Sequence, residues 1–241
     1  KGSIVNAIPP AAVGGRTDTC QRIVDVIFGA LSKAVPDKVV AGCNSAVTTV
    51  LFSGYDSLRN KFFVYPESLG GGLGARSNKD GLDGVHVHVT NSSNLPIECM
   101  EMEYPLIIER FELCMDSGGV GKFRGGLGMR RDYKALVDME FASHADRQVV
   151  PPWGLFGGLS GSGGEFIINP ETENERKLST GKVSEVSLKK GDVLSVRTPG
   201  SGGYGSPNER DKNKILEDLA EGKISKQTVK KFYSVDIDII D

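Results

Sequence analysis

The stretch GGVGKFRGGLG, residues 118–128, decides much of the architecture, because more than half of it is glycine. Glycine makes up 31 of the 241 residues, well above the usual ~7%, and it gathers in further clusters at 70–74, 154–164 and 200–205. Glycine accepts positive φ and lets backbones approach one another closely. With β-branched runs between the clusters, the sequence predicts a body of short strands and tight turns.

The same stretch is similar to a phosphate-binding loop in only part of its pattern. A GxxxxGK(S/T) loop would need glycine at position 116 and serine or threonine at position 123, where the chain has Asp116 and Phe123. No helical pattern follows, so no helix N-terminus is available to hold a phosphate. We therefore expect turns between strands here, and no nucleotide site on this chain.

The region around this stretch, residues 106–204, is predicted to be β-structure. Phe111 and Leu113 alternate with charged neighbours, as on a half-buried strand. The segment VSEVSLKKGDVLSVR, residues 183–197, predicts a β-hairpin with its turn at 190–192. The residues expected to face one another across this hairpin are Val186 and Leu188 on one strand and Leu194 and Val196 on the other.

A helix is predicted near the N-terminus, over residues 17–36, with Thr17 or Thr19 as its N-cap and Pro36 at its end. The apolar residues that repeat along one face of this helix are Ile23, Ile27, Ala30, Leu31 and Ala34. Residues 38–68 follow as two strands joined by a polar turn near Asp56–Asn60.

After the glycine-rich run at 200–205 the composition becomes charged and helical. The apolar residues Ile215, Leu216 and Leu219 predict one amphipathic helix. Ser225 is placed to cap a second helix that carries Val229 and Phe232.

These patterns together predict an α+β fold: a β-rich body of short strands and glycine-rich turns, an N-terminal helix and a small C-terminal helical tail. We divide the chain into a mixed α/β segment over 1–105, a β-rich segment over 106–206 and a helical tail over 207–241.

Composition limits the classes of function. The formal net charge is only −2, so no overall field favours nucleic acid or an anionic membrane. No run approaches the roughly 18 apolar residues of a membrane span. The four cysteines show no metal-ligand spacing. We expect a cytoplasmic protein with free, mostly buried thiols.

Candidate site residues gather between Gly74 and Leu106. His86 and His88 form an HxH pair, and residues two apart in a strand face the same side, so both imidazoles could reach one metal ion or one substrate. Glu101 and Glu103 would also share a face if extended, and carboxylates this close suit acid–base chemistry. The alternatives are hydrogen-bonded strand histidines and surface carboxylates paired with arginines.

The chain resembles the hydantoinase B family in several stretches, in order along almost its whole length. They are GSIVNAIPPAAVGGRTDTCQRIVDVIFGAL, ESLGGGLGARSNKDGLDGVHVHVTNSSNLPIECMEMEYPL, DSGGVGKFRGGLGMRRDY, PPWGLFGG, KGDVLSVRTPGSGGYG and EDLAEGKISKQTVKKFYSVD. That family includes the B subunits of N-methylhydantoinases, the C-terminal region of ATP-dependent 5-oxoprolinases, and related subunits of acetone and acetophenone carboxylases.

The resemblance implies that this chain is the C-terminal half of a longer B-type subunit, as a fragment, a split-gene product or a processed subunit. It places ATP and magnesium on a partner A-type subunit. A divalent metal is possible in the N-terminal half, and no metal ligand or cofactor is expected on this chain alone. The implied partners are the A-type subunit, the N-terminal half of the B-type subunit, and a small cyclic amide or ketone.

The chemistry implied by the resemblance is hydrolysis of a cyclic amide whose carbonyl has been activated by phosphorylation on the A-type subunit. On that hypothesis His86 or His88 transfers a proton, Glu101 or Glu103 orients them, and Arg76, Asp83 and Asn91 contact the substrate. The residues leave two alternatives open: part of a ketone carboxylase, or a non-catalytic assembly module. The chain is expected to be inactive alone.

Overall fold

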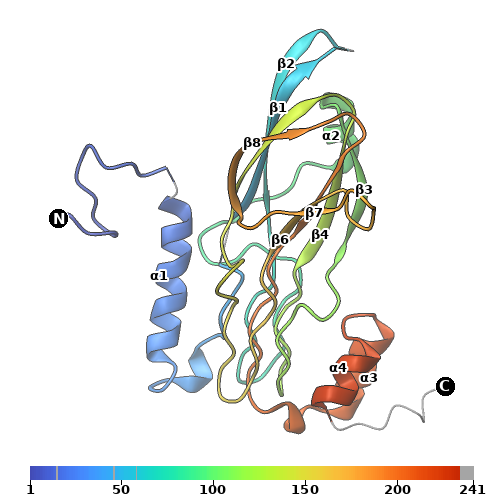
Figure 1. The fold of residues 1–241 in the computed structure, drawn as a ribbon. Coiled ribbons are helices and arrows are strands. Elements are labelled where there is room, and N and C mark those ends of the chain that lie inside the picture. Colours follow the sequence, from blue (N-terminus) through green and yellow to red (C-terminus); the bar gives the residue numbers. More distant parts are fainter. Residues whose placement is uncertain (15, 46, 58, 234–241) are drawn as a thin grey trace.

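The fold is a sandwich of two antiparallel sheets (Figure 1), seen in a computed structural model that describes residues 1–14, 16–45, 47–57 and 59–233. The first sheet has the order β2 (Lys61–Leu69), β1 (Thr48–Asp56), β5 (Met139–His144) and β8 (Lys182–Leu188). The second has the order β3 (Leu106–Leu113), β4 (Met129–Ala135), β9 (Val193–Arg197), β6 (Glu165–Ile168) and β7 (Arg176–Lys177). The predicted α+β class is confirmed.

The hydrophobic core lies between the two sheets and draws on both. Phe52 of β1 and Phe141 of β5 face Tyr133 of β4 and Phe166 of β6, and all four are buried. Because aromatic residues bury 150–250 Å² each, such a cluster contributes much of the stability. Segments 1–105 and 106–206 therefore share one core.

The predicted turn between the first two strands is confirmed, with Asp56 paired to Lys61 at its base. The predicted hairpin over 183–197 is wrong. Its strand β8 pairs with β5 in the first sheet, whereas β9 pairs with β4 and β6 in the second. Both strands point apolar residues into one core, so the alternation typical of a hairpin also fits a chain that crosses between two sheets.

The half-buried pattern predicted for Phe111 and Leu113 is also wrong, because these side chains are 47% and 43% exposed. They lie on β3, an edge strand of the second sheet. A register shift between Ile108 and Arg110 interrupts its pairing with β4, and a bulge of this kind changes which residues face the core.

The predicted N-terminal helix is α1 (Arg16–Leu31), which stands beside the sandwich (Figure 1). Thr17 and Thr19 lie inside it, so neither is its N-cap. The helix ends before Pro36, which instead begins a short 3₁₀ helix, η1 (Pro36–Lys38). A further helix, α2 (Ile97–Glu103), covers residues that include the predicted acidic group.

The predicted tail is confirmed as a helix pair, α3 (Lys212–Ala220) and α4 (Lys226–Phe232), preceded by the 3₁₀ helix η2 (Pro207–Glu209). The Ser225 hydroxyl accepts a hydrogen bond from the Thr228 amide at 3.1 Å, as its predicted capping role requires. Ile215 and Val229 pack in a small second core with Val120. The predicted residues 234–241 of the tail lie outside the described part of the chain.

Below the sheets, extended chains with little sheet structure lie side by side (Figure 1). This glycine bundle comprises residues 41–45, 70–85, 116–128, 152–164 and 198–206. Backbone hydrogen bonds join its chains, such as Gly202 N–H to Gly42 O and Gly42 N–H to Trp153 O, both at 2.8 Å. A Cβ added to Gly202 would lie only 1.8 Å from Trp153 O. The glycine clusters therefore let neighbouring backbones touch.

Two other sequence expectations concern membranes and thiols. Among the described residues, no helix is both long and apolar enough to cross a bilayer. All four cysteines, which lie within the described ranges, are free, but Cys20 and Cys99 are exposed, so the expectation of mostly buried thiols is wrong for these two.

We predict that Gly202→Ala destabilises the fold by about 3 kcal/mol or more, because the methyl group would have to displace the Trp153 backbone. The midpoint of urea unfolding measures this change. Gly14→Ala is the matched control, since a Cβ there would meet nothing within 4 Å. Equal midpoints for the two variants would contradict the close packing described for the bundle.

Candidate functional site

The most unusual polar feature of the molecule lies where α1 meets the body. Of the α1 residues that the structure describes, only Gln21 and Asp25 are buried, and both are polar. They face three loops, residues 43–45, 86–90 and 145–148. We call this contact the α1 seam. Burying a carboxylate costs several kcal/mol unless charge and hydrogen bonds compensate, so the partners of Asp25 determine what this seam can do.

Asp25 is 1% exposed and is surrounded by donors. The Cys43 amide donates to its Oδ1 at 3.4 Å, His88 Nε2 lies 3.2 Å from the same oxygen, and the Arg147 guanidinium contacts Oδ2. Burial acts to raise the pKa of Asp25, but hydrogen bonds from His88 and Ser45 and the charge of Arg147 outweigh it and hold the pKa below its usual value. The carboxylate is therefore ionised.

Because an ionised carboxylate only accepts hydrogen bonds, His88 Nε2 carries the hydrogen and donates it to Asp25. The Ser45 hydroxyl also lies 3.2 Å from this Nε2. In a serine–histidine–aspartate relay the acid and the serine contact different ring nitrogens, so these three residues do not form one. Nδ1 of His88 is the ring atom that remains for taking up or releasing a proton.

The backbone conformation of two residues in this cluster is also unusual. Ser45 and His88 both adopt positive φ, 39° and 55°, a region that costs a residue with a side chain about 1–3 kcal/mol. Such outliers persist only where surrounding contacts enforce them, and they concentrate at functional sites. The positive φ of His88 also shows that the HxH pair does not lie in a strand.

Further polar contacts attach the part of α1 that precedes Asp25. Gln21 Nε2 donates to Val87 O at 3.0 Å, and Arg22 Nε donates to Asp146 Oδ2 at 3.0 Å. Nearer the start of the helix, His144 Nδ1 lies 2.8 Å from Asp18 Oδ2.

Trp153 is half-buried and lies against the seam. The Arg147 guanidinium lies 4.9 Å from its ring centroid, and a methyl group on Gly29 would touch the ring. The seam therefore combines a buried ion pair with a cation–π contact.

Asp25, Cys43 and His88 are the described group whose donor atoms come together as metal ligands might, within 4.8 Å of one another. Burial and the nearby Asp25 raise the pKa of Cys43 to about 12, so its thiol is neutral. The sulfur already accepts a hydrogen bond from the Gly74 amide at 3.3 Å, and Arg147 balances the charge of Asp25. These residues therefore fit a self-compensated polar cluster better than a dication.

The other sequence-predicted site residues are scattered. Glu101 and Glu103 lie on α2, where Glu101 accepts the Ile108 amide at 2.9 Å and Glu103 pairs with Lys61 at 2.6 Å. The carboxylate beside His88 is Asp25, not either of these. Asn91 is exposed and has a positive φ of 47°. Arg76 is half-buried in the glycine bundle, where its amide donates to Lys79 O at 3.0 Å.

His86 is half-buried, and its Nε2 is buried without a hydrogen-bond partner among the described residues. Burial disfavours the charged imidazolium and so lowers the pKa of this histidine. The neutral imidazole is the form that can accept a proton, and the burial that keeps it neutral also weakens it as a base.

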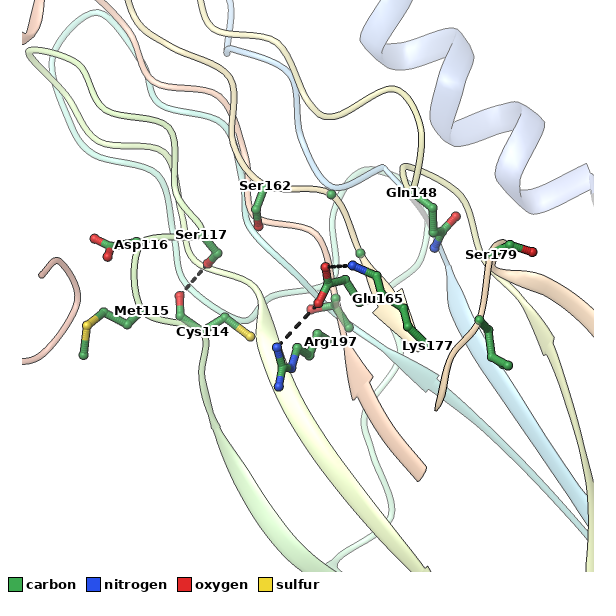
Figure 2. Close-up of a pocket in the computed structure, with 14 residues that line it drawn as sticks. Cys114, Met115, Asp116, Ser117, Gln148, Ser162, Glu165, Lys177, Ser179 and Arg197 are labelled. Carbon is green, nitrogen blue, oxygen red and sulfur yellow. Dashed lines mark hydrogen bonds and ion pairs between the residues drawn. The ribbon is translucent and has the colours of Figure 1, made fainter. Parts of the chain in front are cut away.

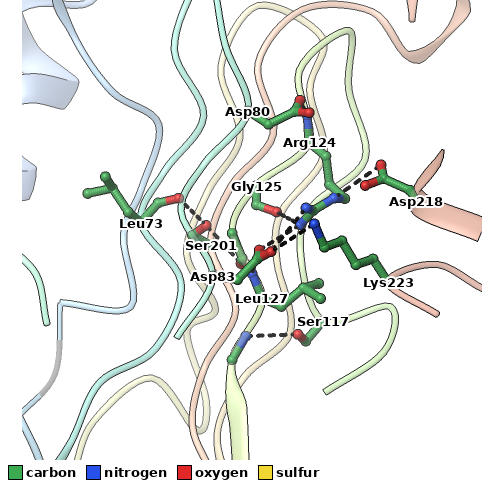
Figure 3. A network of polar contacts seen from close by, with 12 residues as sticks. Leu73, Asp80, Asp83, Ser117, Arg124, Gly125, Leu127, Ser201, Asp218 and Lys223 are labelled. Carbon is green, nitrogen blue, oxygen red and sulfur yellow. Dashed lines mark hydrogen bonds and ion pairs between the residues drawn. The ribbon is translucent and has the colours of Figure 1, made fainter. Parts of the chain in front are cut away.

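Asp83 belongs to a network that binds the C-terminal helices (Figure 3). Its carboxylate lies 3.0 Å from Arg124 Nη1 and 3.6 Å from Lys223 Nζ. Arg124 and Arg210 both contact Asp218 of α3, at 3.3 and 2.6 Å. We call this network the tail clasp. It holds the helices against the loop that leads to His86.

Glu67 is a buried polar residue that the sequence analysis missed. It accepts a hydrogen bond from Asn94 at 2.9 Å and another from Tyr133, and lies 3.4 Å from Arg131. It adjoins a cavity of about 540 Å³ lined in part by residues 92–96. An indication was available: Phe63, Tyr65 and Leu69 occupy the inward positions of β2, and Glu67 continues their two-residue period.

Another cavity, of about 610 Å³, lies between β6, β7 and the glycine bundle (Figure 2). Glu165 pairs there with Lys177 and with Arg197, the latter at 3.5 Å. None of the predicted site residues lines this cavity.

Comparison with known proteins identifies the family of this chain. The Hydantoinase B/oxoprolinase family model matches residues 1–207. The chain is 44% identical over 236 residues to an uncharacterized protein of Methanocaldococcus jannaschii, covering 98% of this chain and 40% of that protein. It is 34% identical over 237 residues to the putative B subunit of a D-/L-hydantoinase from a Pseudomonas species, again covering 98% and 40%.

Among solved structures, the crystal structure of an ATP-dependent caprolactamase from Pseudomonas jessenii superposes with a TM-score of 0.83 at 25% identity, covering 96% of this chain and 42% of that one. The chain therefore shares its fold with part of that caprolactamase. The chain belongs to the Hydantoinase B/oxoprolinase family, and it spans about 40% of the length of the Methanocaldococcus protein and of the hydantoinase subunit named above.

We predict that Asp25→Asn destabilises the fold by about 3–5 kcal/mol, because it leaves the Arg147 guanidinium buried without its counter-charge. Urea unfolding near neutral pH measures the loss. Asp138→Asn is the control, since Asp138 is an exposed carboxylate. An unchanged midpoint for Asp25→Asn would show that this carboxylate does not hold α1.

The same contact predicts a dependence on acid. The folded-state pKa of Asp25 lies below the unfolded value, so its stabilisation is present above the unfolded pKa and is lost as pH falls through the folded one. From pH 7 to about pH 3, the wild type is expected to lose more stability than Asp25→Asn. Parallel curves for the two proteins would contradict this assignment.

A prediction for the tail clasp concerns Asp218. Asp218→Asn removes the carboxylate shared by Arg124 and Arg210, at an expected cost of about 3 kcal/mol, and should speed proteolysis within residues 207–233. Glu217→Gln on the same helix is the control, because its pair with Lys214 is exposed and such pairs contribute little. Equal cleavage rates in the two variants would argue against the clasp.

Proposed function

We propose that this chain is part of a hydantoinase B-type subunit that hydrolyses a cyclic amide after an A-type partner has activated its carbonyl with ATP. The proposal rests on family membership, and the relatives named above as a hydantoinase subunit and a caprolactamase support it. Both names describe enzymes that act on ring amides. ATP and magnesium would be held by the A-type partner, outside this chain.

Ring amides resist attack because resonance delocalises the nitrogen lone pair into the carbonyl. Transfer of a phosphoryl group from ATP to the carbonyl oxygen removes much of that protection. Water then adds to the carbon, the C–N bond breaks as the ring nitrogen takes up a proton, and a second water hydrolyses the resulting acyl phosphate to a carboxylate and inorganic phosphate. The B-type subunit then needs a positioned water, a base to take its proton, and a group that binds the negative charge of the phosphate.

The observation that carries the residue assignment is the state of His86: neutral, half-buried, and with Nε2 unpaired among the described residues. We assign it the role of general base toward water. His88, held by Asp25, is the second proton-transfer candidate, and Asp25 takes over the orienting role first given to Glu101 or Glu103. Arg76, Asp83 and Asn91 remain candidate substrate contacts, and the charge of Arg76 suits it to an anionic group.

The test is turnover of the assembled enzyme, with A-type partner, ATP and a cyclic amide such as hydantoin or 5-oxoproline. His86→Ala is expected to lower ring opening by about 10²–10⁴-fold, the usual contribution of a general base, while ATP consumption by the partner continues. The control is Lys134→Ala, which removes only an exposed ion pair with Glu109.

Two outcomes would overturn the assignment. Full turnover in both His86→Ala and His88→Ala, with assembly intact, would assign this chain a scaffolding role. Consumption of ATP only with a ketone and bicarbonate would place the enzyme in the carboxylase branch instead.

A further inference from the structure

The outer face of α1 is the reverse of what a surface helix normally presents. A helix on the surface of a soluble protein buries its apolar stripe and exposes its polar one. Here Asp25 and Gln21 face the body, while Val26, Ile27 and Leu31 are 64%, 50% and 44% exposed. The predicted apolar stripe therefore exists in α1 but points away from the core.

The chain before α1 extends this apolar surface. In residues 1–14, the side chains of Ile4, Val5, Ile8 and Val13 are exposed, two of them by more than two-thirds. Between this segment and α1 lies a groove of about 630 Å³, lined mainly by apolar residues of both and by Cys20. Apolar surface that is continuous over a segment and a helix usually marks an interface.

We propose that this surface, formed by residues 1–14 and the outer face of α1, binds the further polypeptide that B-type relatives carry beyond the region they share with this chain. The relatives match 98% of this chain within only 40% of their own length, so more than half of each consists of other polypeptide. The match to the solved caprolactamase likewise covers 96% of this chain but only 42% of that one.

The character of the surface fits that occupant. Obligate interfaces resemble a domain core cut in half, with few charges at the centre, and the residues Ile23, Val26 and Ile27 form such a centre. A tethered segment also needs less intrinsic affinity than a separate partner, because tethering raises its effective concentration. With that polypeptide bound, both faces of α1 would be buried. The inner face contacts the body through an ion pair and hydrogen bonds, and the outer face would pack through its apolar side chains.

The native thiols allow a test without substitution. Cys20 lies in the groove and Cys99 lies on α2, and both are exposed in this chain. Alkylation by iodoacetamide, followed by peptide mass spectrometry, gives the rate at each thiol. In the 241-residue chain both should react readily. In the presence of the further B-type polypeptide, fused or as a separate chain, Cys20 should slow by at least about tenfold, as expected for a site reached only by local opening.

Cys99 is the internal reference for changes in reagent or overall stability. An unchanged Cys20 rate on addition of the further polypeptide would overturn the proposal. Protection that arises in the 241-residue chain alone and rises with its concentration would assign the surface to a second copy. Protection that requires the A-type partner would assign it to that partner; both results contradict the proposal. None of these outcomes depends on catalysis, so the proposed function is tested separately.

A second measurement uses Ile27→Lys. Because this side chain is already half-exposed, the substitution should leave the unfolding midpoint of the 241-residue chain nearly unchanged. In the B-type protein with its further polypeptide, the same substitution would bury a lysine charge and should lower the midpoint clearly. Equal effects in both contexts would show that the outer face of α1 stays in solvent.

Discussion

Direct contact between backbones in the glycine bundle sets the positions of most other parts of the molecule. Gly202 and Gly42 lie against Trp153 with no room for a side chain. Chains packed this closely leave the bundle at fixed positions, and the loops that carry Ser45, His88 and Arg147 continue directly from it or lie beside it. The positions of the catalytic candidates therefore follow from contacts between residues that have no chemistry of their own.

Buried charges then join separate parts of the chain to this framework. Asp25 with Arg147 attaches α1, and Asp218 with Arg124 and Arg210 attaches the C-terminal helices. A buried pair is strongly destabilised when one partner is removed, even where the intact pair adds little net stability. Such contacts favour one arrangement over all others. This explains how α1 can bind the body through its polar face and leave its apolar face exposed.

Part of the site is predictable from local patterns. The HxH pattern identifies His88, and this residue does lie in a polar cluster. The same pattern does not reveal its partner Asp25, which lies 63 residues away in the helix α1. The apolar repeat of this helix suggests that its apolar face, not the face with Asp25, is buried. Glu101 and Glu103 share a face only if the chain is extended, and they lie instead on the helix α2, where they contact Ile108 and Lys61. Contacts between distant segments are not encoded in local spacing.

Local patterns in the chain were enough to specify many of the elements: the glycine clusters, several of the strands, the N-terminal helix and the capped tail. These follow from backbone preferences and from periodicity, which act over a few residues. Three features came from tertiary packing alone: the separation of β8 and β9 into different sheets, the inward charges of α1, and the identity of the carboxylate that meets His88. Those outcomes depend on competition between distant surfaces for burial, and a local pattern is compatible with more than one result.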